Sequence, residues 1–378
     1  MRRIAVIGAG IVGAAVAFRL ARSGEARVWI VDRSCPGSGT TSASLAWANA
    51  NEKTPRDYFE LNRTGLEEHF RLRNELPDGA PCLHPGGNIE WAGDETSLEE
   101  LERRVERLRS WGYAAEWREA SWVNKVLEPN VAFPSQDVPV AYFPEEAWVD
   151  APRLANTLVE LARHKGAEAR FGTAVEEIEP GDGRMSALQL QSGERLPIDT
   201  VVNAAGPEAD RVAALLGRAL PLRPSKGLLA RLTVEGAPIG RLLHSPHVNL
   251  RPDGPERVVV HHGSVDKKLE SDTETEEFLS HELVERARRV VPALGCTDIE
   301  SLRVGVRPMP EDGLPCVGAV SNLSGYYEAV THSGVTLGPL LGRLLTQEIL
   351  TGEVDPLIAP FRPDRFAHRE GRSLPTPS

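Results

Sequence analysis

The chain has 378 residues, with 43 lysines and arginines against 54 aspartates and glutamates, and its formal net charge is −11. This length is enough for about two domains, and 41% hydrophobic and 26% charged residues are ordinary for a globular protein with a sizeable core. The acidic balance argues against a nucleic-acid binder, which needs a basic surface for phosphates.

The cysteines Cys35, Cys82, Cys296 and Cys316 lie far apart, with no C-x-x-C pair and no nearby histidine at metal-ligand spacing. This pattern argues against a disulfide-stapled secreted domain and predicts no metal site. We expect a reducing, cytoplasmic location.

Residues 3–33 are typical of a β-α-β unit, with strands at 4–7 and 28–31 and a helix at 11–23. Met1-Arg2-Arg3 before an apolar run also resembles a secretory signal peptide. The glycines in that run have the spacing of a nucleotide-binding turn, so we interpret the run as part of the fold. No other stretch approaches the 18 apolar residues of a membrane span, and no integral membrane segment is expected.

Farther along the chain, apolar spacing predicts helices at 56–76, at 97–110 with Ser97 and Glu100 as a capping box, at 151–165 and at 273–291. Strands are expected at 200–202, over much of 221–265, at 302–306 and at 326–331, with a helix after Gly334. This alternation predicts an α/β fold in which separated segments build a nucleotide-binding domain and a second, more antiparallel domain is inserted.

The first chemical motif is Gly8-x-Gly10-x-x-Gly13, between a strand and a helix. Such glycines permit a tight turn, a close approach to a pyrophosphate and close helix packing, and the helix N-terminus at Ile11 and Val12 offers N–H groups to phosphates. Asp32 ends the second strand, where a carboxylate accepts hydrogen bonds from a ribose. Arg33 leaves NADP open, because a basic residue there accommodates a 2′-phosphate.

Three more motifs combine small and polar residues. They are Gly39-Thr40-Thr41-Ser42-Ala43-Ser44; the strand end Asn203-Ala204-Ala205-Gly206-Pro207; and the pair 304–315 (with Gly305 and Arg307) and 331–339 (with His332, Gly334, Val335, Thr336 and Leu337). Taken singly, each also fits a plain loop or a strand–helix junction.

Together and in this order, these motifs resemble the D-amino-acid oxidase family of flavoproteins, in particular its glycine oxidase and sarcosine oxidase branch. The resemblance covers most of the chain. It implies FAD and oxidation of a C–N bond in an amino acid or secondary amine. Hydride transfer to flavin N5 gives an imine, which is hydrolysed, and oxygen or an electron carrier takes the electrons.

The resemblance also implies roles for individual residues. Arg307 matches the arginine that holds a substrate carboxylate in a bidentate fork, although an ion pair with Glu311 or Asp312 is the alternative. Gly334 to Leu337 match the helix start beside the flavin, Val175 and Gly305 match cofactor contacts, and His332 matches a pocket position. Of His261 and His262, which face opposite sides of a strand, His262 is the one we predict to face the flavin.

Departures from the family pattern refine this interpretation. Asn249 stands where glycine oxidases often have a carboxylate-binding tyrosine, which favours a larger or non-glycine substrate. Gly305 replaces the cysteine that attaches flavin in sarcosine oxidases, so FAD is expected to be noncovalent. No lysine occurs at 258–262, where oxygen-reactive relatives have one.

We therefore predict a Rossmann-like FAD-binding domain at 1–85, 150–220 and 296–369, a substrate domain with a mainly antiparallel sheet at 86–149 and 221–295, and a disordered tail at 370–378. The expected partner is a small amine or amino acid. The alternatives are a dehydrogenase with a non-oxygen acceptor, an aromatic hydroxylase, a nicotinamide enzyme and a non-catalytic nucleotide-binding protein. An aromatic hydroxylase is disfavoured because His332-Ser333-Gly334 replaces its Gly-Asp motif.

Overall fold

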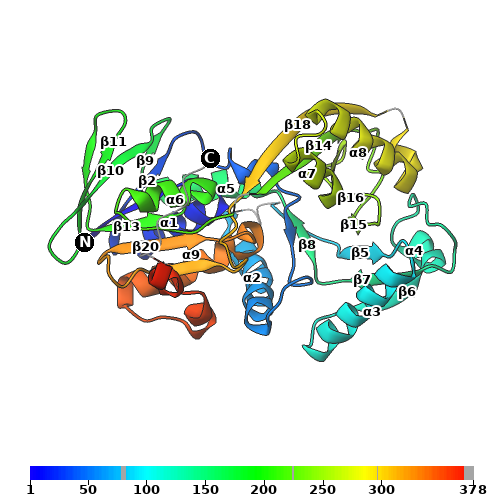
Figure 1. Ribbon diagram of the computed structural model, residues 1–378, viewed down its shortest axis with the longest axis horizontal. Helices are drawn as coiled ribbons and strands as arrows, with labels where there is room; N and C mark the ends of the chain where they lie inside the picture. The colour runs from blue at the N-terminus through cyan, green and yellow to red at the C-terminus, as the bar shows by residue number, and fades with distance from the viewer. Residues whose placement is uncertain (78–81, 224, 296, 370–378) are drawn as a thin grey trace.

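The computed structural model describes residues 1–77, 82–223, 225–295 and 297–369 (Figure 1). Cys296 and the predicted tail at 370–378 lie outside this range. Figure 1 shows two parts side by side, one around a six-stranded sheet on the left and one around an eight-stranded sheet on the right.

The six-stranded sheet has the order β19-β20-β13-β1-β2-β9 and is parallel except for β19. Its inner strands are short and almost wholly apolar, as expected for strands covered on both faces. The strands are β1 (Arg2–Ile7), β2 (Ala26–Asp32), β9 (Glu168–Phe171), β13 (Thr200–Asn203), β19 (Cys316–Ala319) and β20 (Tyr326–Val330).

Helices cover one face of this sheet and a small antiparallel sheet covers the other. On the helical side, α1 (Ile11–Ser23) packs between α5 (Ala151–His164) and α9 (Gly334–Thr351), and α2 (Arg56–Glu75) packs on α9. On the other side, β10 (Val175–Pro180), β11 (Met185–Leu190) and β12 (Arg195–Pro197) share a core with β1 and β2. The short helix α6 (Ala209–Ala214) follows β13. This three-layer α/β arrangement agrees with the predicted fold class.

The eight-stranded sheet has the order β18-β14-β17-β16-β15-β5-β7-β6, and all its pairs are antiparallel except β15 with β5. The strands are β5 (Asn88–Trp91), β6 (Glu116–Glu119), β7 (Pro139–Phe143), β14 (Ser225–Thr233), β15 (Leu242–His244), β16 (Asn249–Pro252), β17 (Arg257–His261) and β18 (Asp298–Arg307). Around it lie α3 (Glu95–Ser110), α4 (Ala120–Val126), α7 (Gly263–Glu270) and α8 (Glu276–Val290).

A small sheet of β3 (Trp47–Ala48), β8 (Ala147–Val149) and β4 (Leu83–Pro85) lies between the two parts. The domain limits stay a prediction, and sheet membership crosses them at two places. Strand β8 falls in the predicted substrate segment 86–149, yet it pairs with β3 and β4 of the predicted cofactor segment 1–85. Strand β18 falls in the predicted cofactor segment 296–369, yet it pairs along its length with β14 of the eight-stranded sheet.

The structure corrects two local expectations. Asp94, and not Ser97, is the N-cap of α3: its side chain accepts from the Ser97 N–H at 2.8 Å, and Ser97 occupies the third helical position of the capping box. Helical spacing puts Phe70 on one apolar stripe with Tyr58, Leu61 and Leu66 in residues 56–76, but Phe70 is exposed. Apolar spacing finds the right helix in both cases but leaves its exact start and the edges of its buried face open.

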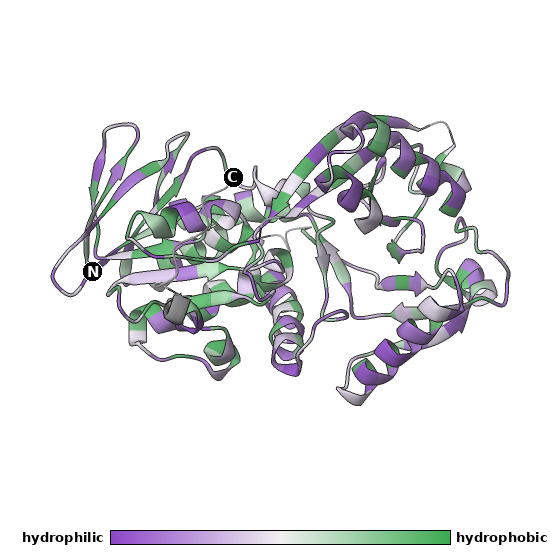
Figure 2. Cartoon of the chain, viewed as in Figure 1, coloured by the Kyte–Doolittle hydropathy of each residue, from purple (hydrophilic) through white to green (hydrophobic). Residues whose placement is uncertain are grey.

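Figure 2 shows that hydrophobic residues concentrate in the six-stranded sheet and its helices, whereas α3 and α8 alternate between hydrophilic and hydrophobic residues along their length. This alternation is typical of helices with one face in water. In the described part of the chain, no helix combines the length and the apolar character needed to cross a bilayer.

Candidate active site

A cavity of about 590 Å³ opens where β1, β2, β13 and β20 end and where α1 and α9 begin. The carboxyl edge of a parallel sheet is the usual ligand site of such folds. Predicted cofactor residues that line the cavity are Gly8, Gly10, Ile11, Val12, Asp32, Arg33, Gly39, Thr40, Thr41, Val175, Ala204, Ala205, Gly206, Gly334 and Val335.

The glycine motif shapes the floor of this cavity. Gly8 has φ +104°, and a Cβ there would come within 2.3 Å of the Ala204 carbonyl oxygen. A Cβ at Gly13 would come within 1.9 Å of the Gly8 carbonyl oxygen, so Gly13 serves helix–strand packing and does not line the cavity. Gly10 caps α1 without a side chain, which leaves the helix N-terminus open toward the cavity.

Asp32 supports the loops around the cavity. Its carboxylate accepts hydrogen bonds from the backbone N–H of Ala9 at 2.7 Å and of Ser34 at 2.8 Å. Arg33 is largely exposed and pairs with Glu208, which also pairs with Arg211. The Glu208 carboxylate therefore pairs with both arginines at this end of the cavity.

The segment 39–44 is a 3₁₀ turn, η1 (Thr40–Ala43), that joins the cavity to β18. Thr40 donates to the Val306 carbonyl at 2.6 Å, and the Thr41 hydroxyl accepts from the Ile11 N–H at 3.1 Å. Ser42 bonds within the turn, and neither it nor Ala43 lines the cavity. A Cβ at Gly305 would come within 2.7 Å of the Ala43 carbonyl oxygen, so this glycine lets β18 pack on the turn.

The start of α9 forms another wall. Gly334 and Val335 line the cavity, whereas Thr336 bonds to the β3 segment and Leu337 is fully buried in the core. His332 lines the cavity and is exposed to it. Partial desolvation by the surrounding protein, together with the positive charges of Lys53 and Arg307, lowers the pKa of His332 to about 4. Its imidazole is therefore neutral at ordinary pH.

Arg307, at the end of β18, is held by a network on the eight-stranded sheet. Its guanidinium donates to Asp266 of α7, to the Ser225 hydroxyl at 3.2 Å and to the Lys226 carbonyl at 3.0 Å. Neither Glu311 nor Asp312 takes the place of Asp266; Asp312 pairs with Arg365. Both terminal nitrogens of Arg307 form hydrogen bonds within the protein. A bidentate hydrogen bond from Arg307 to a substrate carboxylate stays a prediction.

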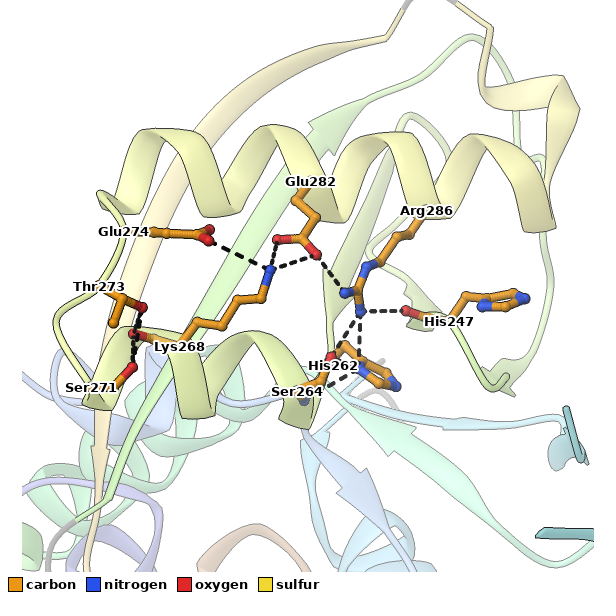
Figure 3. A network of polar contacts seen from close by, with 9 residues as sticks. All are labelled: His247, His262, Ser264, Lys268, Ser271, Thr273, Glu274, Glu282 and Arg286. Atoms are coloured by element: carbon orange, nitrogen blue, oxygen red, sulfur yellow. Dashed lines mark hydrogen bonds and ion pairs between the residues drawn. The ribbon is translucent and has the colours of Figure 1, made fainter. Parts of the chain in front are cut away.

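The two neighbouring histidines separate as their strand geometry requires. His261 lies with its Nε2 3.1 Å from Arg307 and 2.8 Å from Asp266. His262 is the N-cap of α7 and contacts Ser264 and Arg286 (Figure 3). The Arg286 guanidinium also donates to Glu282 and to the His247 carbonyl. The structure thus brings His261, and not His262, to Arg307.

Comparison with known proteins identifies the family, because the family described as DAO, FAD dependent oxidoreductase, matches residues 3–348. The chain belongs to the DAO family. An uncharacterized oxidoreductase, YurR, of Bacillus subtilis is 27% identical over 96% of this chain and 99% of its own, and a glycine oxidase of Geobacillus kaustophilus is 27% identical over 97% and 98%.

Solved structures agree with this assignment. The crystal structure of glycine oxidase from Geobacillus kaustophilus has a TM-score of 0.83 at 25% identity, covering 96% of this chain and 98% of its own. Iminodiacetate oxidase from Chelativorans sp. BNC1 has a TM-score of 0.81 at 25% identity, covering 96% and 99%. The predicted family and fold class are confirmed, and the protein is an FAD-dependent oxidoreductase.

The cavity of this DAO-family protein fits FAD on its own geometry. The uncapped N-terminus of α1, without an acidic residue in its first turn, suits the pyrophosphate. An added Cβ at Gly10 would lie 3.2 Å from the Thr41 hydroxyl, closer than ordinary van der Waals contact, so the glycine keeps this space free. Gly305 stands at the position that matches the flavin-attaching cysteine of sarcosine oxidases, and a glycine has no side chain to form that bond.

Several residues that line the cavity lie outside the sequence motifs: Ile7, Val31, Ser34, Cys35, Ser38, Thr173, Ala174, Glu208, Arg211, Val212, Leu215, Ala329 and Val330. Some follow known motifs directly, and extending each motif by a few residues finds them. Thr173 and Ala174 belong to no motif. They lie at the cavity because they follow β9, which pairs with β2, and the Thr173 N–H donates to the Asp32 carbonyl at 3.3 Å.

Proposed function

We propose that this protein oxidises a C–N bond in a small amino acid or secondary amine that carries a carboxylate, with FAD bound noncovalently. The observation that carries the proposal is the cavity at the start of α1 and α9, where His332 is exposed to the cavity with the cations Lys53 and Arg307 and the anion Glu52 close enough to influence its imidazole. Glycine and iminodiacetate, the compounds named in two relatives, are both amines that carry carboxylates.

The residues around His332 favour an anion beside the redox centre. Lys53 lies half-buried between β3 and α2, and burial lowers its pKa while Glu52 and Glu146 oppose that effect. Arg307 adds a second positive charge behind His261. A substrate carboxylate attracted by these cations would orient the carbon next to the amine nitrogen for reaction.

FAD supplies the two-electron acceptor. Loss of a hydride from the carbon and of a proton from the nitrogen converts the amine to an imine. Water hydrolyses the imine to a carbonyl compound and releases ammonia from a primary amine or an amine from a secondary one. His332 has a pKa of about 4 and is a weak base, so activity that rises with pH reports loss of the substrate's ammonium proton. Oxygen, giving hydrogen peroxide, or an electron carrier then takes the two electrons.

The test is an anaerobic titration of the purified holoenzyme with D- and L-amino acids, N-methyl amino acids and simple amines. Bleaching of the flavin absorbance by the carboxylate-bearing amines is the expected result. Readmitted air then distinguishes an oxidase from a dehydrogenase with another acceptor. A flavoprotein that no amine bleaches would refute the proposed substrate class.

Charge removal tests the carboxylate site. We expect Lys53→Met to raise KM for carboxylate-bearing amines by about 10- to 100-fold, the range for a hydrogen bond between charged groups, and to change turnover of simple amines little. Lys267→Met, on the exposed side of α7, is the matched control and should leave both unchanged. Equal effects of Lys53→Met on both substrate types would contradict the role of Lys53.

A further inference from the structure

A row of three polar side chains crosses the eight-stranded sheet beside Arg307. His261 of β17 is in register with Asn249 of β16, and Asn249 is in register with His244 of β15. Residues opposite one another in adjacent strands point to the same face of a sheet. Their neighbours Val260, Leu250 and Leu243 are fully buried in the core on the opposite face. The polar row therefore lies on the face turned away from that core.

Contacts at both ends of the row connect this face to segments beside the cavity. His261 contacts the guanidinium of Arg307 at 3.1 Å, which fixes one end of the row. At the other end, the His244 ring packs on the Trp47 ring, with centroids 4.1 Å apart. The Trp47 carbonyl accepts from Thr336 at the start of α9, the helix whose first residues line the cavity. His244 is thus tied to the cavity wall through Trp47.

His244 is fixed in one hydrogen-bonding state. Its Nδ1 lies 2.7 Å from Oδ1 of the fully buried Asn88, so Nδ1 carries the proton and donates it. Burial, reinforced by the positive charge of Arg104, lowers the pKa of His244 to about 3 and keeps the ring neutral. The lone pair therefore lies on Nε2, which has no hydrogen-bond partner among the described residues.

We infer that His244 is a specificity-determining residue whose Nε2 accepts a hydrogen bond from a donor group on the substrate, away from the C–N bond that is oxidised. This inference rests on the proposed function. Strands lie about 4.8 Å apart, so the backbones of His261 and His244, two strands apart, are separated by roughly 10 Å. A substrate that reaches from Arg307 to His244 is longer than glycine and carries a hydroxyl, amide or ammonium group.

Two pairs of substrates with equal heavy-atom count test this inference. Homoserine against norvaline, and ornithine against norleucine, differ only in having a donor or a methyl group at the end; both enantiomers are compared. We expect the wild-type holoenzyme to prefer the donor member of at least one pair by about tenfold in kcat/KM, mostly through KM. His244→Phe keeps a flat ring beside Trp47 and should abolish that preference.

Variants of Asn88 separate recognition from structure. Asn88→Leu should weaken the preference, because it releases the Nδ1 proton from its acceptor. Asn88→Asp should keep the preference at high pH and lose it as pH falls, since a carboxylate beside the ring favours the imidazolium, which has no lone pair. A purely structural role for His244 predicts no such pH dependence. His247→Phe, on the exposed turn after β15, is the matched control.

Binding without oxidation tests the His244 inference separately from the proposed function. 4-Hydroxybutanoate and pentanoate lack the amine, and their dissociation constants follow from the perturbed flavin spectrum. We expect the hydroxy acid to bind more tightly to wild type and equally to His244→Phe. Bleaching by amines without any donor preference in catalysis or binding overturns the His244 inference alone. If no amine bleaches the flavin, the proposed function fails and the inference fails with it.

Discussion

Glu146 gives the sharpest prediction about stability. This carboxyl group is fully buried behind the active site, where its oxygens accept from the Trp47 indole at 2.6 Å and from the Tyr113 hydroxyl at 3.0 Å. Burial raises the pKa of Glu146 from 4.5 to about 8, against the effect of those two hydrogen bonds. The folded protein therefore holds a proton on Glu146 that the unfolded chain has released at neutral pH.

The sign and size of the effect follow from this difference. Between about pH 4.5 and 8 the native state binds the extra proton, so the free energy of unfolding falls as pH rises, by about 1.4 kcal/mol per pH unit. The loss is complete above pH 8 and reaches about 5 kcal/mol as an upper limit. Glu146→Gln is neutral at every pH and keeps an acceptor for Trp47, so it should remove this loss and be more stable than wild type at pH 8.

The assay is urea unfolding of the holoenzyme from pH 5 to pH 9, followed by tryptophan fluorescence. Glu145→Gln is the matched control, because Glu145 is the exposed neighbour and loses a charge without losing a buried proton. The decisive quantity is the difference between each variant and wild type at each pH. A constant difference across this range for Glu146→Gln would refute the reasoning.

Two further predictions follow from packing and burial. Gly8→Ala places a Cβ 2.3 Å from the Ala204 carbonyl oxygen at a φ of +104°, so we expect FAD to be lost, as a lower flavin-to-protein absorbance ratio. Gly263→Ala, whose Cβ would have no atom within 4 Å and which lies outside the cavity lining, is the control and should retain FAD. Arg218→Met leaves the buried Glu328 carboxylate without its 2.7 Å ion-pair partner, which should lower the free energy of unfolding in urea by about 3–5 kcal/mol. The double variant Arg218→Met with Glu328→Met should recover much of this loss, and a double variant without recovery would contradict the role of the ion pair.

The sequence by itself determined the cofactor half of the protein, because its signals are local. The spacing of Gly8, Gly10 and Gly13 fixes a turn and a helix start within a few residues, and Asp32 follows at the end of the next paired strand. Backbone geometry over about 30 residues decides such a unit, so the fold class and family could be predicted from the residues alone.

Only the tertiary structure decided the substrate half. Strand alternation shows that His261 and His262 face opposite sides, but the choice between the sides depends on α7, which His262 caps and from which Asp266 reaches Arg307. Likewise, His244 and Asn88 lie 156 positions apart and meet because β15 pairs with β5. Contacts between strands so distant in sequence depend on the whole sheet's register, which no local pattern encodes.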